Sequence, residues 1–482
     1  MLQRRALLLG LILGGSFAWS AAPIAEESWM GVYLLGQKVG YMHFATRPTT
    51  HAGKAAFLIE SLSVIRANVL GQKLEETVAT KQVSDERWAP RQLTFTQKSG
   101  GRTSAVVAEF FADRVECKQV TEQRTQSKTV KIPAGINLIA DHQALMQKQR
   151  FKSGETLTFH EFNPALMTID KNTLTALGEE ELELDGVKQR AQVVQHTASL
   201  GGGTISSKMW LGANGDLLKM TSLLNLTFVK EAKDQALQFP AGDKPIDIAF
   251  ATSIRPMKAI DKPREVRYLK LQVGGASALS GIPQDARIKL TRTGDLGVLE
   301  VTATKFDAAK GARLPIKATA HAQWLKDGPY VEATDPGIIR QARSIVGEEK
   351  NAYRAAQKIR DWVHKRIEWR ADIGVMRSAR DILGDPAGVC RDAAVLYTAL
   401  ARAAGLPTRI AAGLTYAPAP EAGFFGHAWA ETWVGEWVPF DPTLGEGFVD
   451  ATHLKLAQGE YTCFFDIVSA LGQLKLEVLE AR

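Results

Sequence analysis

Hydrophobic and polar residues alternate along much of the first half of the chain. Short alternating runs recur at residues 29–33, 56–59 and 105–110, with turn-forming residues between them. Alternation with a period of two is typical of β-strands that bury one face. The pattern therefore predicts a β-rich domain of antiparallel sheet over residues 23–250.

The clearest single turn in this region is Asn214-Gly215. It lies between two apolar runs at residues 208–211 and 217–220. Asn-Gly is favoured in two-residue turns because both residues tolerate a positive φ. We therefore expect a β-hairpin here.

Four prolines mark a change in the chain between residues 240 and 263. Proline interrupts regular structure, so we expect a linker. Two short apolar runs follow at residues 287–290 and 298–301, with turn-forming residues between them. Residues 251–334 are therefore predicted to hold the linker and a small β region.

Helical spacing replaces the period of two after Asp335-Pro336. That pair is typical of a helix N-cap followed by proline in the first turn. Apolar residues at helical spacing also predict a helix over residues 390–404, ended by Gly405. Three strands are predicted after this helix: residues 408–416, 427–434 and 436–440. Residues 335–482 thus mix helices with strands, and the predicted fold class of the whole chain is α+β.

The first residues of the chain fit neither pattern. Arg4 and Arg5 precede an apolar run at residues 6–17, and small residues follow. A basic start, a short apolar run and a small-residue cleavage site together form a signal peptide, here residues 1–22. We therefore expect a periplasmic or secreted protein, or a membrane-anchored one if the signal is not cleaved. No later segment is long and apolar enough to predict a membrane span.

Length and composition limit the number of domains and the classes of binding partner. A chain of 482 residues with 45% hydrophobic and 23% charged residues is expected to form about two to four soluble domains. The net charge of +7 and the isoelectric point near 9.1 could indicate nucleic-acid binding. The basic residues are dispersed along the chain, however, so no nucleic-acid partner is predicted.

Three cysteines are few for a protein expected outside the cytoplasm. A disulfide framework uses an even and larger number. Cys117 and Cys463 could pair with each other, or each could be an isolated buried thiol, which is the arrangement we expect. Either arrangement leaves Cys390 without a structural partner and favours a reactive role for its thiol.

Three residues with complementary chemistry follow one another late in the chain: Cys390, His427 and Asp441. A thiolate can attack a carbonyl carbon, an imidazole can move the protons, and a carboxylate can fix the tautomer of the imidazole. The gaps between the three are too long for one helix face. Only the tertiary fold can therefore bring them together.

The predicted elements give each of these residues a place in one site. Cys390 begins a helix, where the dipole and the unpaired backbone N–H groups favour a thiolate and could hold an oxyanion. His427 and Asp441 lie on neighbouring predicted strands, so the carboxylate could accept the far N–H of the imidazole. Asp392 in the first turn is expected to cap the helix.

Around these residues the sequence resembles the core of the transglutaminase-like superfamily, whose fold is papain-like. The resemblance covers roughly residues 335–460 and implies Cys390 as nucleophile, His427 as general base and acid, and Asp441 as the residue that orients the imidazole. It rests on blocks in the same order: Gly388-Val389-Cys390, residues 399–409, residues 426–431, Gly435-Glu436-Trp437 and Asp441-Pro442-Thr443. The β-rich first half resembles, in its strand pattern alone, the curved antiparallel sheets of periplasmic carrier-like domains.

Other residues near these blocks have less specific patterns. Many family members stabilise the oxyanion with an aromatic or polar side chain upstream of the cysteine, but neither Trp362 nor Trp369 can be matched to that role. We expect Glu431 to pair across strands or lie at the surface, and His453 to be structural. The tryptophans of the last strands are expected to pack in the sheet core: Trp429, Trp433 and Trp437.

The resemblance implies an exported thiol enzyme that acts on amide bonds of a protein or peptide substrate through a thioester on Cys390. The acyl acceptor is water in a peptidase or amidase and an amine in a transglutaminase. Hydrolysis is preferred, because no amine site can be identified. No cofactor is predicted, and no metal, because Cys390, His427 and Asp441 lack a fourth ligand at zinc spacing. The alternative is a catalytically silent scaffold in a cell-envelope binding protein.

Overall fold

The computed structural model describes most of the chain from residue 26 to the C-terminus. The described residues are 26–142, 146, 151–200, 203–222, 226–239, 245–279, 281–316, 319–418, 422–445, 447–464 and 472–482. The predicted signal peptide at residues 1–22 lies outside them. Among the described residues, no helix has the length and apolar character needed to cross a membrane.

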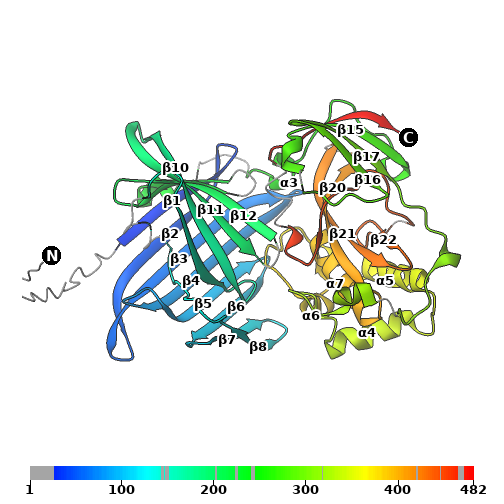
Figure 1. The fold of residues 1–482 in the computed structure, drawn as a ribbon, viewed down its shortest axis with the longest axis horizontal. Coiled ribbons are helices and arrows are strands. Elements are labelled where there is room, and N and C mark those ends of the chain that lie inside the picture. The colour runs from blue at the N-terminus through cyan, green and yellow to red at the C-terminus, as the bar shows by residue number, and fades with distance from the viewer. Residues whose placement is uncertain are drawn as a thin grey trace, which may run out of the picture.

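The first half of the molecule is an antiparallel sheet of 14 strands (Figure 1). The strands follow the order β8-β7-β6-β5-β4-β3-β2-β1-β14-β13-β12-β11-β10-β9, so nearly every strand pairs with its neighbour in sequence. Their bounds are β1 (Glu26–Leu34), β2 (Gln37–His51), β3 (Lys54–Val69), β4 (Gln72–Asp85), β5 (Pro90–Ser99), β6 (Arg102–Phe110), β7 (Arg114–Thr121), β8 (Thr125–Lys131), β9 (Thr156–Asn163), β10 (Thr168–Leu184), β11 (Val187–Leu200), β12 (Gly203–Leu211), β13 (Leu217–Thr221) and β14 (Leu226–Glu231). The predicted β-rich antiparallel half is confirmed.

Tight turns produce this strand order, because a two-residue turn pairs each strand with the one before it. Leu70-Gly71 joins β3 to β4 with φ angles of 50° and 79°, a region that glycine adopts at little cost. The hairpin predicted at Asn214-Gly215 is confirmed, since β12 and β13 pair on either side of it.

The 14-stranded sheet curls so that strands distant in sequence face each other. Side chains of β5, β6 and β7 share a buried cluster with Phe162 of β9 and with Leu138. The rings of Phe110 and Phe162 pack edge to face, with centroids 5.5 Å apart. Strands such as β5, β6 and β7 bury one face inside the curl, which is the physical origin of the alternating pattern in the sequence.

The linker leads to a second sheet with the order β16-β17-β15-β24. Its strands are β15 (Tyr268–Gly274), β16 (Ile288–Thr293), β17 (Leu296–Thr302) and, from the C-terminus, β24 (Lys475–Ala481). Short helices lie before, within and after this region of the chain: α2 (Lys233–Leu237), α3 (Ile248–Ala251), η2 (Pro263–Glu265), η3 (Ala276–Leu279), η4 (Ala308–Lys310) and η5 (Thr319–Leu325). Leu271 and Leu299 of this sheet share one buried cluster with Val395 and Leu414 further along the chain. The small β region and the last domain therefore have a common hydrophobic core.

The last domain packs four helices against a sheet with the order β22-β21-β20-β23 (Figure 1). Its elements are α4 (Pro336–Val346), α5 (Ala352–Arg366), β18 (Glu368–Trp369), α6 (Ala379–Gly384), β19 (Ala387–Gly388), α7 (Cys390–Ala403), β20 (Thr408–Ala417), β21 (Gly423–Trp433), β22 (Trp437–Phe440) and β23 (Leu454–Gly459). Asp335 accepts hydrogen bonds from the N–H groups of Gly337 and Ile338 at 2.7 and 3.1 Å, which confirms the predicted N-cap. Helix α7 contacts α4, α5 and α6 as well as β20 and β21, so most of its residues are buried.

One strand is longer than the pattern predicts. The expected strand over residues 427–434 begins at Gly423, because β20 and β21 pair as far as Ala417 and Gly423. Ile254 of the linker also exchanges backbone hydrogen bonds with Phe424 of β21. The linker therefore contacts the strand that carries His427.

Candidate active site

Cys390 is the first residue of α7, and the backbone before it is closely packed. The N–H of Val389 donates to the Asp392 carboxylate at 3.0 Å, so the predicted capping role of Asp392 is confirmed. Gly388 has φ +152°, and a Cβ there would meet the Asp392 carboxylate at 2.5 Å. Glycine is therefore required at this position, and the start of the helix is fixed where the thiol emerges.

The three cysteines occupy different environments. Cys390 is half-buried, whereas Cys117 and Cys463 are both buried as thiols. Burial raises the pKa of the Cys117 thiol to about 11 despite the opposing charge of Lys128, which makes this thiol a poor nucleophile. The expectation that Cys117 and Cys463 are buried thiols rather than a disulfide is confirmed, and Cys390 is the more accessible of the three.

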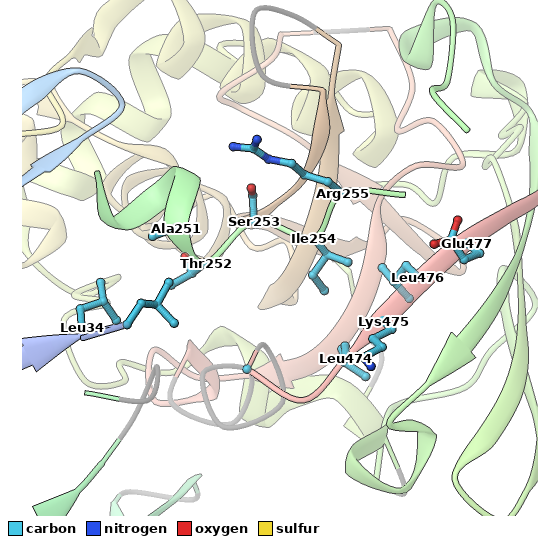
Figure 2. Close-up of a pocket in the computed structure, with 12 residues that line it drawn as sticks. Leu34, Ala251, Thr252, Ser253, Ile254, Arg255, Leu474, Lys475, Leu476 and Glu477 are labelled. Atoms are coloured by element: carbon cyan, nitrogen blue, oxygen red, sulfur yellow. The ribbon is translucent and has the colours of Figure 1, made fainter. Parts of the chain in front are cut away.

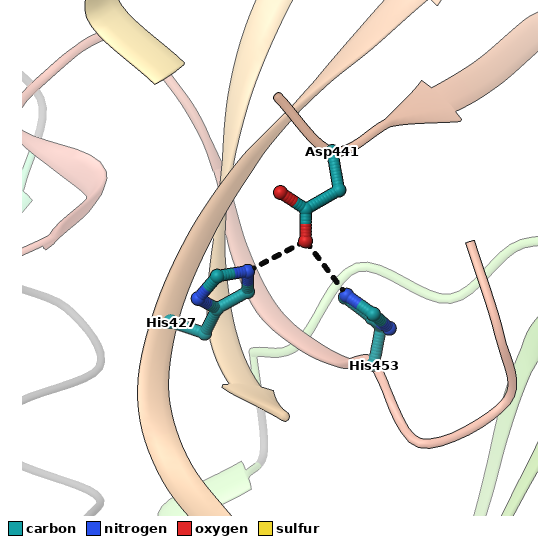
Figure 3. Close-up of side chains that lie close together, drawn as sticks. All are labelled: His427, Asp441 and His453. Atoms are coloured by element: carbon teal, nitrogen blue, oxygen red, sulfur yellow. Dashed lines mark hydrogen bonds and ion pairs between the residues drawn. The ribbon is translucent and has the colours of Figure 1, made fainter. Parts of the chain in front are cut away.

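His427 and Asp441 meet in the interior beside this helix. His427 lies on β21, and Asp441 directly follows the neighbouring strand β22. The Nε2 atom of His427 donates to Oδ2 of Asp441 at 2.7 Å (Figure 3), and both side chains are buried. Adjacent antiparallel strands thus produce the side-by-side placement that the sequence predicts.

The electrostatics of this pair favour the charged form of both residues. Burial opposes the imidazolium, but the Asp441 charge, its hydrogen bond and the contact with Cys390 together raise the pKa of His427 to about 10. Burial likewise opposes the carboxylate, but His427 and His453 hold the pKa of Asp441 well below its usual range. An imidazolium beside a sulfur favours the thiolate.

The Cys390 side chain is near enough to His427 to contribute to the raised pKa of the imidazole. The structure therefore brings together the three residues that the sequence singles out. The thiol lies near the imidazole, and the Asp441 carboxylate holds the imidazole by a hydrogen bond. This is the order of contacts that nucleophilic catalysis by a thiol requires.

Neighbouring aromatic and acidic side chains pack rather than line a groove. Trp429 is fully buried and its ring stacks on His427 with centroids 6.0 Å apart. Glu431 is buried and forms ion pairs of 2.7 Å with both Arg409 and Lys455. The expected core packing of Trp429 and cross-strand pairing of Glu431 are confirmed.

The two upstream tryptophans lie in different places. Trp369 is 43% exposed and sits on β18, where it is in register with Gly388 of β19. Trp362 lies on α5 and lines a depression together with Arg340 and Arg366. Of the two tryptophans, Trp369 therefore lies beside the start of α7.

The N-terminal sheet contacts the loop that leads to Cys390. Ser99 Oγ donates to the carbonyl of Asp372 at 3.1 Å and accepts from the N–H of Gly374 at 3.0 Å. From the other side, Arg391 donates to the carbonyl of Val375 at 3.1 Å. Loop residues 371–375 are thus held between the two halves of the molecule.

A cavity of about 410 Å³ lies at a different place, between the N-terminal sheet, the linker and β24 (Figure 2). Leu34, Ile254 and Leu476 supply apolar walls, and Arg255 and Glu477 supply charged groups. The three candidate catalytic residues are not part of its lining. The thiol site is therefore separate from this cavity.

His453 is the site residue whose place the sequence did not predict. Its Nε2 lies 3.1 Å from Oδ2 of Asp441, the oxygen that also accepts from His427 (Figure 3). One atom each of His427, Asp441 and His453 could serve as metal ligands, since they lie within 4.8 Å of one another. The separations are those of N–H···O hydrogen bonds, which explain the arrangement without an ion.

Comparison with known proteins identifies a family for the region that contains the candidate active site. Residues 339–442 match the family model of the transglutaminase-like superfamily, and this segment includes Cys390, His427 and Asp441. No curated protein matches the chain.

Two solved structures are similar to parts of the chain. The "Putative Cysteine Protease from Cytophaga hutchinsonii" is 17% identical over 44% of this chain and 82% of its own, with a TM-score of 0.30. A β-barrel-like protein of a domain of unknown function from Brucella abortus is 11% identical over 43% of this chain and 95% of its own, with a TM-score of 0.34. Both scores are low, and the family match is the informative one. The chain therefore contains a transglutaminase-like superfamily domain at residues 339–442.

Proposed function

We propose that this protein is an exported thiol enzyme that acts on amide bonds through Cys390, His427 and Asp441 in a papain-like core. The observation that carries the proposal is the buried hydrogen bond between His427 and Asp441, with the half-buried Cys390 thiol near enough to influence the imidazole. The family match at residues 339–442 supports it. The proposed export rests on the signal-peptide pattern at residues 1–22.

The first half of the reaction forms a thioester. The Cys390 thiolate attacks the carbonyl carbon of the amide, so that a C–S bond forms and the carbonyl electrons move to oxygen. As the C–N bond breaks, the His427 imidazolium donates its proton to the leaving amine. Asp441 keeps the imidazole in the orientation that this transfer needs.

The second half releases the acyl group. Water attacks the thioester, neutral His427 accepts a proton from it, and the C–S bond breaks to give a carboxylic acid and the starting thiolate–imidazolium pair. A primary amine attacking in place of water would give a new amide instead. We favour water, because an exposed thioester meets water at far higher concentration than any amine.

The start of α7 is suited to hold the negative oxygen of the intermediates. Backbone N–H groups in the first turn of a helix have no partner within the helix, and the dipole there favours negative charge. The Asp392 cap takes the N–H of Val389 and leaves those of the first turn for the oxyanion. The backbone pairing of Trp369 with Gly388 supports Trp369 as the candidate for a second donor.

The proposal is tested with synthetic peptides and a biotinylated primary amine, analysed by mass spectrometry after incubation with the mature protein. We expect cleaved or deamidated peptides from wild type, and biotinylated ones if an amine is the acceptor. Turnover should fall by at least about 10³-fold in Cys390→Ala, because the covalent route is lost.

A matched control is His51→Ala, which removes a histidine at the end of β2 in the N-terminal sheet and should leave turnover unchanged. Equal product formation by wild type and Cys390→Ala would contradict the proposal. The proposal would also be contradicted if wild type formed no product and its Cys390 thiol reacted no faster than a thiol in an unfolded chain. That outcome would favour the silent scaffold.

A further inference from the structure

His453 lies on the opposite side of Asp441 from His427. It precedes β23 directly and is 1% exposed. Figure 3 shows the Asp441 carboxylate between the two imidazole rings, with one oxygen accepting from both. His453 also lies beyond the segment that matches the superfamily, residues 339–442.

The surroundings of Asp441 show what His453 adds. Oδ1 accepts the backbone N–H groups of Thr443 and Leu444 at 2.7 and 3.2 Å. Oδ2 accepts from His427 at 2.7 Å and from His453 at 3.1 Å. A carboxylate with partners on both oxygens cannot rotate without breaking several hydrogen bonds. His453 supplies the second restraint on the oxygen that His427 uses.

His453 is itself fixed by its surroundings. Its Nδ1 lies 3.2 Å from Oδ2 of Asp450, an ion-pair distance without hydrogen-bond geometry. Asp450 in turn accepts from the N–H and hydroxyl of Thr452 at 2.7 and 2.6 Å and forms an ion pair of 2.7 Å with Arg264. The ring of Trp429 packs edge-on against His453 with centroids 5.4 Å apart. A firmly held donor can transmit its position to the group that it contacts.

We propose that His453 is a positioning residue for the acyl-transfer reaction, which it serves by holding the Asp441 carboxylate in the orientation that His427 requires. The inference rests on the proposed function of Cys390, His427 and Asp441. The rings of His453 and His427 pack edge to face with centroids 5.6 Å apart, but the hydrogen bond of His453 goes to Asp441, and its proposed effect passes through that carboxylate. A purely structural histidine would stabilise the fold through Asp450 and leave the geometry of His427 unchanged.

Two polar variants separate these roles. The amide of His453→Gln can reach the place of Nε2 and donate to Asp441. The shorter His453→Asn reaches the place of Nδ1, so it keeps the contact with Asp450 and loses the one with Asp441. We expect His453→Asn to lower kcat by about 10- to 100-fold, the range for residues that orient another functional group, with KM unchanged. His453→Gln should recover most of the loss.

A spectroscopic measurement on the full mature protein gives a readout that needs no substrate. The N–H proton of His427 that points at Asp441 should give a downfield NMR resonance that exchanges slowly with water, because its hydrogen bond is short and buried. This resonance should persist in His453→Gln and broaden or disappear in His453→Asn.

The outcomes distinguish the two proposals. If wild type shows no turnover that depends on Cys390 but the resonance behaves as expected, the proposed function fails and the positioning of Asp441 by His453 stands. If wild type is active and the two variants behave alike in kcat and in the resonance, the positioning role is overturned. A change in melting temperature alone would assign His453 a structural role and also overturn it.

Discussion

His427 combines full burial with a raised pKa, and this combination determines how the site should respond to pH. The charge of Asp441, 2.7 Å away, outweighs the burial that opposes the imidazolium and raises the pKa of His427 to about 10. The site therefore holds a protonated imidazole at neutral pH. At this scale the chemistry is set by one hydrogen bond and one buried charge.

Turnover should therefore have an alkaline limit near pH 10, measured as kcat against pH. Above this pH His427 is neutral and cannot protonate the leaving group, while alkylation of Cys390, which needs no proton donor, should continue.

The stability of the fold should also depend on pH through His427. The pKa of His427 in the folded state lies above its ordinary value of 6.5. Its ion pair with Asp441 thus stabilises the fold fully below about pH 6.5, and this contribution is lost as the pH rises through about 10.

Asp441→Asn removes the charge that raises the pKa of His427, so the alkaline limit of turnover should move toward neutral pH in this variant. An alkaline limit that stays in place would contradict the assignment of the limit to the His427–Asp441 pair.

Single residues could be predicted where each lies in a distinctive block of sequence, as Cys390, His427 and Asp441 do. His453 could not, because its significance lies in a contact with Asp441 that only the tertiary fold creates. A histidine before a strand is structural in most proteins. The one local sign is Asp450, three residues earlier, which places a second carboxylate against the ring.

Among the elements, α7 determines where the nucleophile sits. Its first residue is Cys390, and the turn before it depends on Gly388 and on the carboxylate of Asp392. The helix packs against α4, α5 and α6 on one side and the β20–β21 sheet on the other. The thiol thus emerges from a rigid element beside the strand that carries His427.

Asp392→Ala should lower the free energy of unfolding by about 1 kcal/mol through loss of the cap and should also slow alkylation of Cys390. Asp335→Ala is the matched control, because Asp335 caps the neighbouring helix α4 with two hydrogen bonds. It should destabilise the protein by a similar amount and leave the alkylation rate unchanged. Chemical denaturation and alkylation kinetics measure the two effects, and equal alkylation rates in both variants would contradict the role of the α7 start.

Elements with a strong local pattern were predictable, such as α7 between Pro386 and Gly405 or the β12–β13 hairpin at Asn214-Gly215. The early start of β21 was not, because it depends on pairing with β20 and with the linker at Ile254. Pairing between segments far apart in sequence leaves no local signal.

At the scale of the whole molecule, the N-terminal sheet and the last domain meet at the loop of residues 371–375, which lies between α5 and α6. Ser99 makes two hydrogen bonds to this loop, and Arg102 pairs with Asp385 at 2.6 Å. The chain between α5 and α7 is therefore held at these places by the N-terminal sheet. The sequence predicts both halves but not this contact, nor the pairing of β24 with β15, because both join residues distant in sequence.

Ser99→Ala should increase hydrogen exchange at residues 371–375, because it removes both hydrogen bonds that tie this loop to β5. Arg66→Ala, which removes an exposed ion pair with Glu75 on the same sheet, should leave exchange in the loop unchanged. Hydrogen-exchange mass spectrometry measures the effect, and an unaltered loop in Ser99→Ala would show that the N-terminal sheet does not hold it.

The most direct test of the central claim is the reactivity of Cys390 in the folded protein. Near neutral pH, limiting iodoacetamide should alkylate Cys390 selectively and leave Cys117 and Cys463 unmodified, as mapped by mass spectrometry. The rate should fall at least about tenfold in His427→Ala, because the imidazolium that favours the thiolate is gone. A Cys390 that reacts no faster in the native protein than in the urea-unfolded chain, or equally fast without His427, would contradict a Cys390–His427–Asp441 active site.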